Sequence, residues 1–333
     1  MWSVADIPDQ RGRRILVTGA TSGLGRYAAL LLARAGAAVT LAGRDEQRLA
    51  ATAAEFAADP AVRTAGGAVE TLLLDLSDLD SVRRAGDEFR AGQRRLDVLL
   101  NAAGMQSFRY DRSADGIEQH LATNYVGAFA LTGALLPVLT ATPGARVTTV
   151  TSMVYKWGDP ADPAAWFDAA PEPGADGSPS TRFRARFAYS KLAYSNSKLA
   201  VALFAVELDR RLRAAGASVT ATVAHPGTTS TDLLREWPAA AARVYMGTAR
   251  LLRAAHPIEQ AVLPLLRAAT DPAADISVVH APGGPIREQA GPPATFPFAA
   301  KIAEAIAEGA AERLWTITED RIGYAVPVVR PTG

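Results

Sequence analysis

The stretch Thr18-Gly19-Ala20-Thr21-Ser22-Gly23-Leu24-Gly25 stands between an apolar run at 14–18 and a pattern of helical period at 23–35. Its glycines permit a tight turn from strand to helix and a close approach of a ligand to the backbone. The first helical turn adds unpaired N–H donors and a partial positive charge, which bind phosphate groups. The stretch therefore predicts a site for the diphosphate of a dinucleotide. Its spacing, G-x-x-x-G-x-G, is not the commoner G-x-G-x-x-G, so an ordinary strand-to-helix turn remains the alternative for the motif alone.

Outward from this turn, short β-branched or leucine-rich runs alternate with longer alanine-rich stretches of helical period. This alternation predicts an α/β protein with a doubly wound Rossmann fold and a seven-stranded parallel sheet. We expect strands at 14–18, 37–42, 69–74, 95–100, 145–151, 217–223 and 276–280. We expect helices at about 23–35, 45–58, 78–92, 114–140, 190–215 and 258–270.

Two segments rich in proline and glycine interrupt this rhythm, at 157–188 and at 281–297. The first predicts a long loop between a strand and a helix, and the second a loop before an amphipathic helix from 299 to about 317. No internal repeat and no dividing linker is evident. We therefore expect one Rossmann-type domain over 1–333, with an inserted active-site loop at 157–188 and a C-terminal loop-helix extension at 281–333.

The composition excludes several classes of function. The 35 Lys and Arg against 34 Asp and Glu leave a net charge of +1, which gives no global attraction to nucleic acid or to an anionic membrane. With no cysteine and only four scattered histidines, we expect no metal site. The most apolar window, 199–206, is far shorter than the roughly 20 residues that cross a bilayer. The first fourteen residues lack the apolar stretch of a signal peptide, so we expect a cytoplasmic protein.

The end of the second expected strand bears on the choice of cofactor. An NAD-binding fold places an acidic residue there to hold the ribose 2′-hydroxyl, whereas this chain has Gly43 followed by Arg44. A guanidinium pairs with a 2′-phosphate, so NADP(H) is favoured over NAD. Asp45 weakens the inference, although it also suits the N-cap of the next helix. A solvated surface charge remains the alternative for Arg44.

Three further strand ends carry candidate cofactor contacts. Asp75 and Leu76 close the third strand, where a carboxylate accepts from an adenine amino group or else caps the next helix. The fourth strand ends in the small residues that let the chain pass beneath a ribose, although Asn101 is also a turn former. These residues are Asn101, Ala102, Ala103 and Gly104. After the sixth strand, backbone and hydroxyl groups from Pro226 to Thr231 are placed to grip a carboxamide, and His225 is interpreted as structural.

A phenol and an ammonium, Tyr194 and Lys198, stand four residues apart near the start of an expected helix, on one face. A positive charge about 4 Å from a phenol is worth roughly 4 kcal/mol at an effective dielectric constant of 20, or about 3 pK units. Such a phenol exchanges a proton near neutral pH. Tyr189 and Lys191 are nearby rivals, but neither has a partner one turn away. A packed tyrosine beside a solvated lysine is the structural alternative.

Two more polar residues are expected near this pair. The fifth strand runs into Ser152, and ligands of open α/β sheets bind outside the carboxyl ends of the strands. The Ser152 hydroxyl there stabilises charge on a substrate carbonyl or, alternatively, simply ends the strand. Asn124 lies in the mostly apolar helix 114–140, where it satisfies a neighbour in the core or holds a water that passes protons to Lys198.

Taken together, these motifs make the chain resemble the classical short-chain dehydrogenase/reductase family, and within it the retinol-dehydrogenase-like and WW-domain-oxidoreductase-like branch. The branch is indicated by the stretches at 6–9, 193–200, 225–227 and 311–315. The resemblance implies a catalytic tetrad of Asn124, Ser152, Tyr194 and Lys198. It also implies that Thr229 and Thr231 lie near the nicotinamide carboxamide, and that the protein forms a homo-dimer or homo-tetramer.

We therefore expect reversible hydride transfer between NADP(H) and the carbonyl or alcohol of a mainly apolar small molecule. Candidates for an apolar pocket are Met105, Phe108, Tyr155, Trp157, Trp166 and Trp237. The alternative is a catalytically inactive NADP-binding regulator or scaffold of the same fold. A sugar-nucleotide enzyme would call for a larger C-terminal domain than the roughly 50 residues after the last expected strand.

Overall fold

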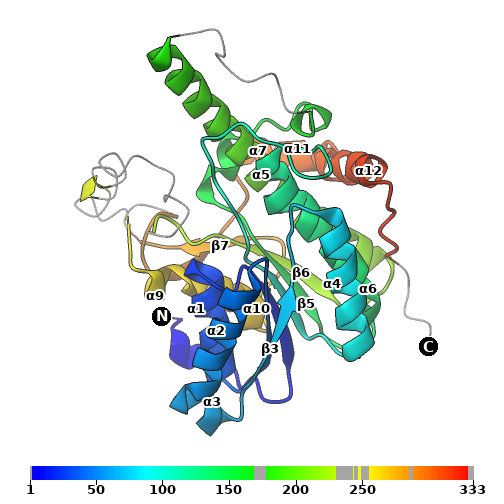
Figure 1. Ribbon diagram of the computed structural model, residues 1–333. Helices are drawn as coiled ribbons and strands as arrows, with labels where there is room; N and C mark the ends of the chain where they lie inside the picture. The colour runs from blue at the N-terminus through cyan, green and yellow to red at the C-terminus, as the bar shows by residue number, and fades with distance from the viewer. Residues whose placement is uncertain are drawn as a thin grey trace.

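A computed structural model describes residues 2–168, 178–229, 255–284 and 288–328, together with residues 243, 247 and 248. In these parts of the chain, one sheet of eight strands runs in the order β3-β2-β1-β4-β5-β6-β7-β8 (Figure 1). The pairs from β3 to β7 are parallel, and β7 pairs with β8 antiparallel. The chain crosses over between β1 and β4, the switch point at which doubly wound sheets bind ligands.

Each of the seven expected strands is present. The strands are β1 (Arg14–Thr18), β2 (Ala38–Gly43), β3 (Ala68–Leu73), β4 (Val98–Asn101), β5 (Arg146–Val150), β6 (Thr220–Ala224), β7 (Val279–Pro282) and β8 (Pro293–Phe296). The eighth strand corrects the expected count, because β8 lies within the segment predicted to be a loop at 281–297. The prolines of this segment indicated a loop, because proline is tolerated at the start of an edge strand but not within a central strand.

The helices also follow the expected order, with some changes at their ends. They are α1 (Gly23–Arg34), α2 (Glu46–Ala58), α3 (Pro60–Ala65), α4 (Leu79–Gly92), α5 (Gln119–Leu121), α6 (Gly127–Thr140), α7 (Pro179–Ala214), α9 (Ile258–Ala261), α10 (Leu263–Thr270), α11 (Ala300–Ala307) and α12 (Ala310–Ile322). A π-helical turn, η2 (Ala122–Val126), joins α5 to α6. Short 3-10 turns occur at η1 (Val4–Asp6), η3 (Met153–Trp157) and η4 (Ala164–Trp166).

The largest differences from the expected bounds are at two helices. The helix predicted at 190–215 begins at Pro179, so the end of the predicted loop 157–188 is helical. Ser178 caps this helix by accepting from the Thr181 N–H, and proline suits a first helical position. The closing helix predicted at 299–317 is two helices, divided at Gly309, whose φ of +82° is left-handed. Residues 169–177 of the insertion lie outside the described part of the chain.

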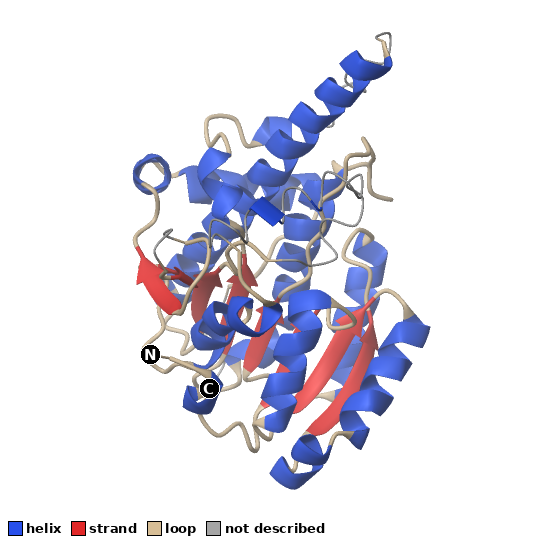
Figure 2. Cartoon of the chain, turned by 90° about the vertical axis from the view of Figure 1, so that its left-hand side faces the viewer, coloured by secondary structure: helices blue, strands red, loops and turns tan. Residues whose placement is uncertain are grey.

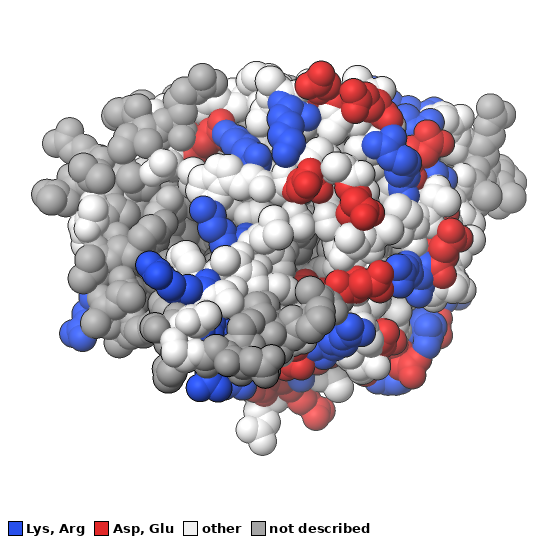
Figure 3. All heavy atoms as spheres, turned by 90° about the horizontal axis from the view of Figure 1, so that it is seen from above, with Lys and Arg blue, Asp and Glu red and all other residues white. Residues whose placement is uncertain are grey.

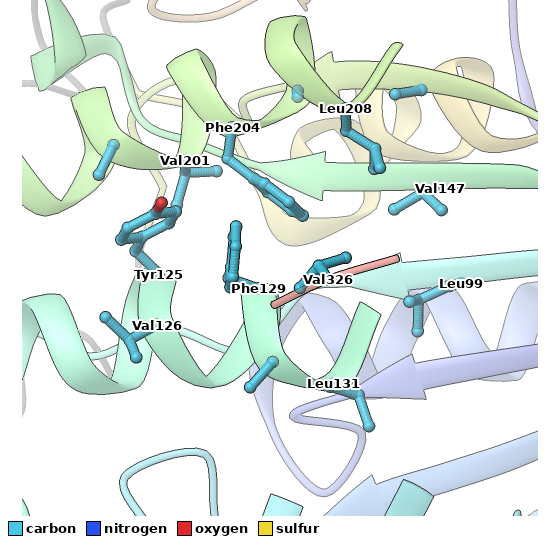
Figure 4. Close-up of a cluster of buried hydrophobic side chains, with 14 of the residues drawn as sticks. Leu99, Tyr125, Val126, Phe129, Leu131, Val147, Val201, Phe204, Leu208 and Val326 are labelled. Carbon is cyan, nitrogen blue, oxygen red and sulfur yellow. The ribbon is translucent and has the colours of Figure 1, made fainter. Parts of the chain in front are cut away.

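The sheet is covered on both faces (Figure 2). One apolar cluster joins the sheet to α1, α2 and α10, and a larger one joins it to α4, α6, α7 and α12. Aromatic rings form the middle of the larger cluster (Figure 4). The ring of Phe129 lies 5.5 Å from that of Phe204 and 4.8 Å from that of Trp315. This contact between α6, α7 and α12 supports the proposal that the C-terminal extension belongs to a single domain.

One helical stretch, Gln119–Thr140, is long and apolar enough to cross a membrane by length and composition, within the residues described. Its apolar window is 83% buried inside the protein, among the core residues that cover the sheet. A buried core helix has the same composition as a spanning helix, so this feature is weak evidence for a membrane span. The expected cytoplasmic location stays a prediction.

Replacing Trp315 by alanine tests the role of α12 in the core. The indole is 1% exposed and lies between Phe129 and Phe204, so its loss leaves a cavity. We expect the free energy of unfolding to fall by about 3–5 kcal/mol in urea titrations. Thr316→Ala, on the exposed face of α12, is the control and should change stability by less than about 0.5 kcal/mol. Equal effects of the two changes would contradict this packing.

Candidate active site

A cleft of about 630 Å³ opens at the carboxyl ends of the strands. Its wall is built from the segments that follow β1 to β6, so six separate connections meet around one space. Figure 3, which views the protein from above, shows acidic and basic side chains interspersed over the described part of this face. The described part of this face therefore carries charges of both signs rather than a field of one sign.

The glycine turn after β1 forms one end of the cleft. Gly19 and Gly23 have φ angles of +67° and +53°, a region that glycine adopts at low cost. A Cβ on Gly19 would lie 2.9 Å from the Ala103 Cα, and a Cβ on Gly25 would lie 2.6 Å from the Gly19 carbonyl oxygen. Only glycine fits these two positions. The turn thus leaves the first N–H groups of α1 beside the cleft, which suits a diphosphate.

Most of the residues predicted to bind a cofactor line this cleft. They are Gly19, Thr21, Ser22, Gly23, Leu24, Gly25, Arg44, Asp75, Leu76, Ala102, Ala103, Gly104, Tyr194, Lys198, Pro226, Gly227 and Thr229. Thr231 lies outside the described residues. Asn101 is not among the lining residues: its amide donates to the Thr132 hydroxyl at 3.2 Å, on the helix-covered side of β4. The carbonyl oxygen of the Asn101 side chain is buried and has no hydrogen-bond partner in the part of the chain that the structure describes.

The acidic residues near the cleft act as turn caps. Asp75 accepts from the Ser77 N–H at 2.9 Å and from the Ser77 hydroxyl at 2.7 Å. Asp45 accepts from the Arg48 N–H at 3.0 Å and caps α2. The capping interpretation is therefore correct for Asp45 and wrong for Asp75, because the N-cap of α4 is Asp78 and Asp75 instead closes a turn onto Ser77. Both Asp45 and Asp75 also line the cleft. Because Asp45 is engaged as a cap, the carboxylate does not take the place of an acidic ribose-binding residue at Gly43.

Three candidate catalytic residues line the same cleft. Ser152 follows β5, and Tyr194 and Lys198 lie one turn apart in the buried part of α7. The Ser152 hydroxyl lies near enough to the Tyr194 phenol to oppose the rise in the pKa of that phenol. The Lys198 Nζ donates to the Val150 carbonyl at 3.0 Å and lies 5.9 Å from the centroid of the Tyr194 ring. Both side chains are nearly buried, with Tyr194 6% and Lys198 4% exposed, and both line the cleft.

Asn124 lies directly behind this group, in the π-helical turn η2. Its side-chain oxygen accepts from the Met105 N–H at 2.7 Å, and its amide donates to the Met105 carbonyl and the Ser197 hydroxyl. A Cβ on Gly104 would lie 3.0 Å from the Lys198 Nζ and 3.5 Å from the Asn124 side-chain oxygen. Asn124 therefore satisfies the hydrogen-bonding groups of Met105 and Ser197, and Gly104 lies between its side chain and the Lys198 ammonium. π-Helical turns such as η2 are frequent at functional sites.

Burial dominates the protonation of both titratable groups. It lowers the pKa of Lys198 to about 8 and raises the pKa of Tyr194 to about 12, against an opposing hydrogen bond from Ser152. The expectation that Lys198 lowers the phenol pKa toward neutrality is therefore wrong for the protein without a ligand. The free energy lost when the phenolate is removed from water exceeds the stabilisation that the Lys198 ammonium gives it. Tyr194 is consequently a protonated donor at neutral pH.

The segment from Ser107 to Asp111 forms a wall of the cleft that sequence reasoning missed. Ser107, Arg109 and Asp111 line the cleft. The intervening rings face α7 instead: Phe108 stacks on Phe187 with ring centroids 5.8 Å apart, and the Tyr110 ring is tilted against that of Tyr189 with centroids 5.1 Å apart. Extended chains present alternate side chains to opposite sides, so the pattern S-F-R-Y-D was an available signal.

A buried carboxylate fixes this wall to the catalytic helix. Glu118 lies 2.6 Å from the His120 Nδ1 and accepts from the Tyr189 hydroxyl at 2.8 Å and from the Leu121 N–H at 2.8 Å. The Ser107 N–H donates to the other ring nitrogen of His120. Tyr189 therefore links α7 to the cleft wall through Glu118. Because its hydroxyl is engaged there, Tyr189 is not the candidate proton donor. Burial and the negative charge of Glu118 raise its pKa.

The expected apolar pocket is largely not formed by the residues proposed for it. Among the six candidates, Met105 lines the cleft, whereas Tyr155 and Trp166 are buried in the core. Trp157 is 56% exposed, with the Lys191 ammonium 5.2 Å from its ring centroid. Trp237 lies outside the described residues. Aromatic content near a strand end is therefore a poor guide to the pocket wall, because such rings pack the core.

The donors present fit a dinucleotide. The Thr229 hydroxyl lines the cleft and is buried with no hydrogen-bond partner among the described residues, which suits the amide of a ligand. The glycine turn supplies backbone donors at the opposite strand end. Within the described residues, no group of three His, Asp or Glu side chains is placed to hold a metal ion.

Comparison with known proteins identifies the family. The short chain dehydrogenase profile matches residues 13–163. Polyprenol dehydrogenase from Mus musculus is 38% identical over 254 residues, which cover 72% of this chain and 68% of the relative. Retinol dehydrogenase 14 from Homo sapiens is 37% identical over 235 residues, which cover 67% of this chain and 64% of the relative. The chain thus spans about two thirds of the length of these relatives.

Solved structures agree. A Mycobacterium paratuberculosis protein superposes with a TM-score of 0.71 at 33% identity, covering 98% of this chain and 99% of that one. A Beutenbergia cavernae protein described as an NAD(P)-dependent gluconate 5-dehydrogenase, with bound NADP, gives 0.56 at 27% identity, covering 80% and 93%. The chain belongs to the short-chain dehydrogenase family of NAD(P)-dependent oxidoreductases, in its retinol-dehydrogenase-like branch.

The buried ammonium gives a prediction for stability. A lysine pKa lowered to about 8 in the folded protein means that folding is penalised below pH 8, and that the penalty disappears as pH rises toward 10.5. Lys198→Met should therefore raise the free energy of unfolding by about 2 kcal/mol at pH 7, with a smaller gain above pH 10. Urea titrations at several pH values measure this. Lys191→Met, at an exposed position, is the control, and a loss of stability in Lys198→Met would contradict the pKa assignment.

Proposed function

We propose that this protein transfers hydride reversibly between NADP(H) and the carbonyl or alcohol of a mainly apolar small molecule. The observation that carries the proposal is that Ser152, Tyr194 and Lys198 line the same cleft, with the hydroxyl near the phenol and the ammonium buried beside the phenol ring. Two hydroxyl donors that converge in a nearly dry site are the arrangement a carbonyl oxygen needs as it gains negative charge.

In this mechanism, each side chain has a separate task. Bound NADPH supplies the hydride. Tyr194 donates its proton to the substrate oxygen, and Ser152 holds that oxygen by a hydrogen bond. Lys198 lies between the phenol and Gly104, where it binds a ribose hydroxyl and stabilises the phenolate left after proton transfer. Asn124 holds the Met105 backbone and Ser197, and thereby positions the loop and the helix that carry these groups.

The preference for NADP(H) rests on two arginines. Arg44 follows β2 and Arg48 follows one helical turn later, so both line the same end of the cleft. No carboxylate stands at Gly43 to favour a ribose hydroxyl, and Asp45 is engaged as a cap. Paired guanidinium groups bind a 2′-phosphate by charge-assisted hydrogen bonds. The structural relative with bound NADP supports the same choice.

The substrate class is inferred from the relatives and from the wall of the cleft. Relatives named for retinol and polyprenol support an apolar alcohol or aldehyde. The polar residues Arg109 and Asp111 on the cleft wall restrict the apolar part to the region near Met105. An inactive NADP-binding regulator is the second candidate, but a binding protein has no need of the Ser152–Tyr194 pair. A homo-dimer or homo-tetramer and a cytoplasmic location stay predictions.

Replacing Tyr194 by phenylalanine tests the proton donor. The ring remains packed while the hydroxyl is lost, so turnover of an aliphatic aldehyde panel should fall by about 100- to 10,000-fold. NADPH affinity, measured by fluorescence titration, should change less than about threefold. Tyr324→Phe is the control, because it removes the hydroxyl of an exposed tyrosine that does not line the cleft. Full activity in Tyr194→Phe would exclude the phenol as the acid.

Replacing Arg44 and Arg48 by alanine, singly and together, tests the cofactor. Loss of a charge-assisted contact to phosphate should weaken NADPH by about 10-fold or more for each arginine and leave NADH nearly unchanged. Isothermal titration with both cofactors measures the difference. Arg63→Ala, on exposed α3, serves as the control for lost positive charge. An equal loss of affinity for NADH and NADPH would show that these arginines do not read the 2′-phosphate.

A further inference from the structure

A charged network lies behind the cleft, outside the groups that the mechanism uses. Its centre is Glu288, from the connection between β7 and β8, which is 6% exposed. One carboxylate oxygen lies 2.6 Å from the Lys156 Nζ, and the other lies 3.1 Å from the His225 Nε2. Isolated buried carboxylates are costly, so two donors on one such group indicate a specific arrangement.

The His225 end of the network is fixed by hydrogen bonding. The Gly227 N–H donates to the His225 Nδ1 at 3.2 Å, so Nδ1 is unprotonated and Nε2 carries the hydrogen that Glu288 accepts. Burial lowers the pKa of His225, which keeps the ring neutral. His225 begins the β6 loop, defined as residues 225–229. This loop supplies Pro226, Gly227 and Thr229 to the cleft.

The Lys156 end of the network lies on the segment that carries Ser152. Lys156 belongs to the β5 turn, defined as residues 152–157, which begins with Ser152. The Thr228 hydroxyl also contacts the Met153 sulfur at 3.9 Å, so the two segments touch directly. Glu288 therefore bridges the segment that carries the substrate-holding hydroxyl and the segment that carries the carboxamide-facing hydroxyl.

The backbone around Glu288 is shaped for this bridge. Glu288 has a φ of +63°, the one positive φ at a non-glycine position in the described residues. The next residue, Gln289, accepts the Thr228 N–H at 2.7 Å, and a Cβ on Gly227 would lie 2.2 Å from the Gln289 carbonyl oxygen. A left-handed glutamate is unfavourable and persists where its surroundings require it. The strain is thus located where the carboxylate meets both loops.

We propose that Glu288 is a positioning residue for hydride transfer: by binding Lys156 and His225 at once, it sets the distance between the β5 turn and the β6 loop. Resting on the proposed function, this inference adds that the C-terminal segment controls the approach of nicotinamide and substrate. Misplacement by about 1 Å at a reacting centre costs up to about 100-fold in rate. A carboxylate suits the task, because it accepts two hydrogen bonds in fixed directions from two separate segments.

The test is Glu288→Gln, which preserves size but turns one acceptor into a donor that faces Lys156 or His225. We expect kcat per NADPH-binding site to fall about 10- to 100-fold, with a larger primary deuterium isotope effect from deuterated NADPH. We also expect the Gly227 and Thr228 amides to exchange hydrogen at least about 10-fold faster, measured by mass spectrometry with and without NADPH. Lys156→Met should act similarly, and Lys156→Arg should restore most of kcat.

Two comparisons separate positioning from a general loss of stability. Asp168→Asn, which breaks the exposed ion pair with Arg321, is the control and should leave kcat, isotope effect and exchange unchanged. In the double variant Glu288→Gln/Lys156→Met, the loss should be smaller than the product of the two single losses. Unchanged kcat and isotope effect in Glu288→Gln would overturn the proposal. A fall in kcat that only follows a fall in folded fraction would overturn it as well.

Failure of the proposed function has a different signature. If the wild-type protein binds NADPH but turns over no carbonyl, the proposed function fails while exchange at Gly227 and Thr228 still tests the bridge. Exchange that stays at the wild-type rate in Glu288→Gln then overturns the bridge itself.

Discussion

The buried ammonium of Lys198 is the constraint on which the site depends. It is 4% exposed, and burial alone determines its shifted pKa, with no carboxylate contributing among the described residues. A cation in such a place is costly, and among the described residues the Val150 carbonyl and the adjacent Tyr194 ring offset this cost. The unneutralised charge remains available to a ligand hydroxyl and to a phenolate formed by proton transfer.

Much of the fold follows from local patterns in the chain. Each expected strand and most helices are found, because buried parallel strands and amphipathic helices differ in period and composition. The errors occur where tertiary context decides. Strand β8 depends on pairing with β7, which no local pattern reveals, and α7 continues back to Pro179 through a segment whose composition indicates a loop.

The site was predictable where it consists of strand ends and one helical turn, as for Ser152, Tyr194 and Lys198. Three features needed the structure. The pKa of Tyr194 depends on burial, which a spacing rule does not measure. Asn101 turns toward Thr132 because of the helix that covers β4. The Glu288 bridge joins segments far apart in sequence, and long-range pairs of this kind leave no local trace.

These features describe a cleft in which the chemistry is carried by a few buried polar groups and the remaining polar side chains hold segments in place. A crystal structure with NADP(H) bound tests this most directly. The account predicts the nicotinamide carboxamide at the Thr229 hydroxyl, a ribose hydroxyl at the Lys198 ammonium, and the Tyr194 oxygen open to the reactive face of the ring. A nicotinamide bound elsewhere, or a Tyr194 oxygen separated from it by protein, would contradict the account.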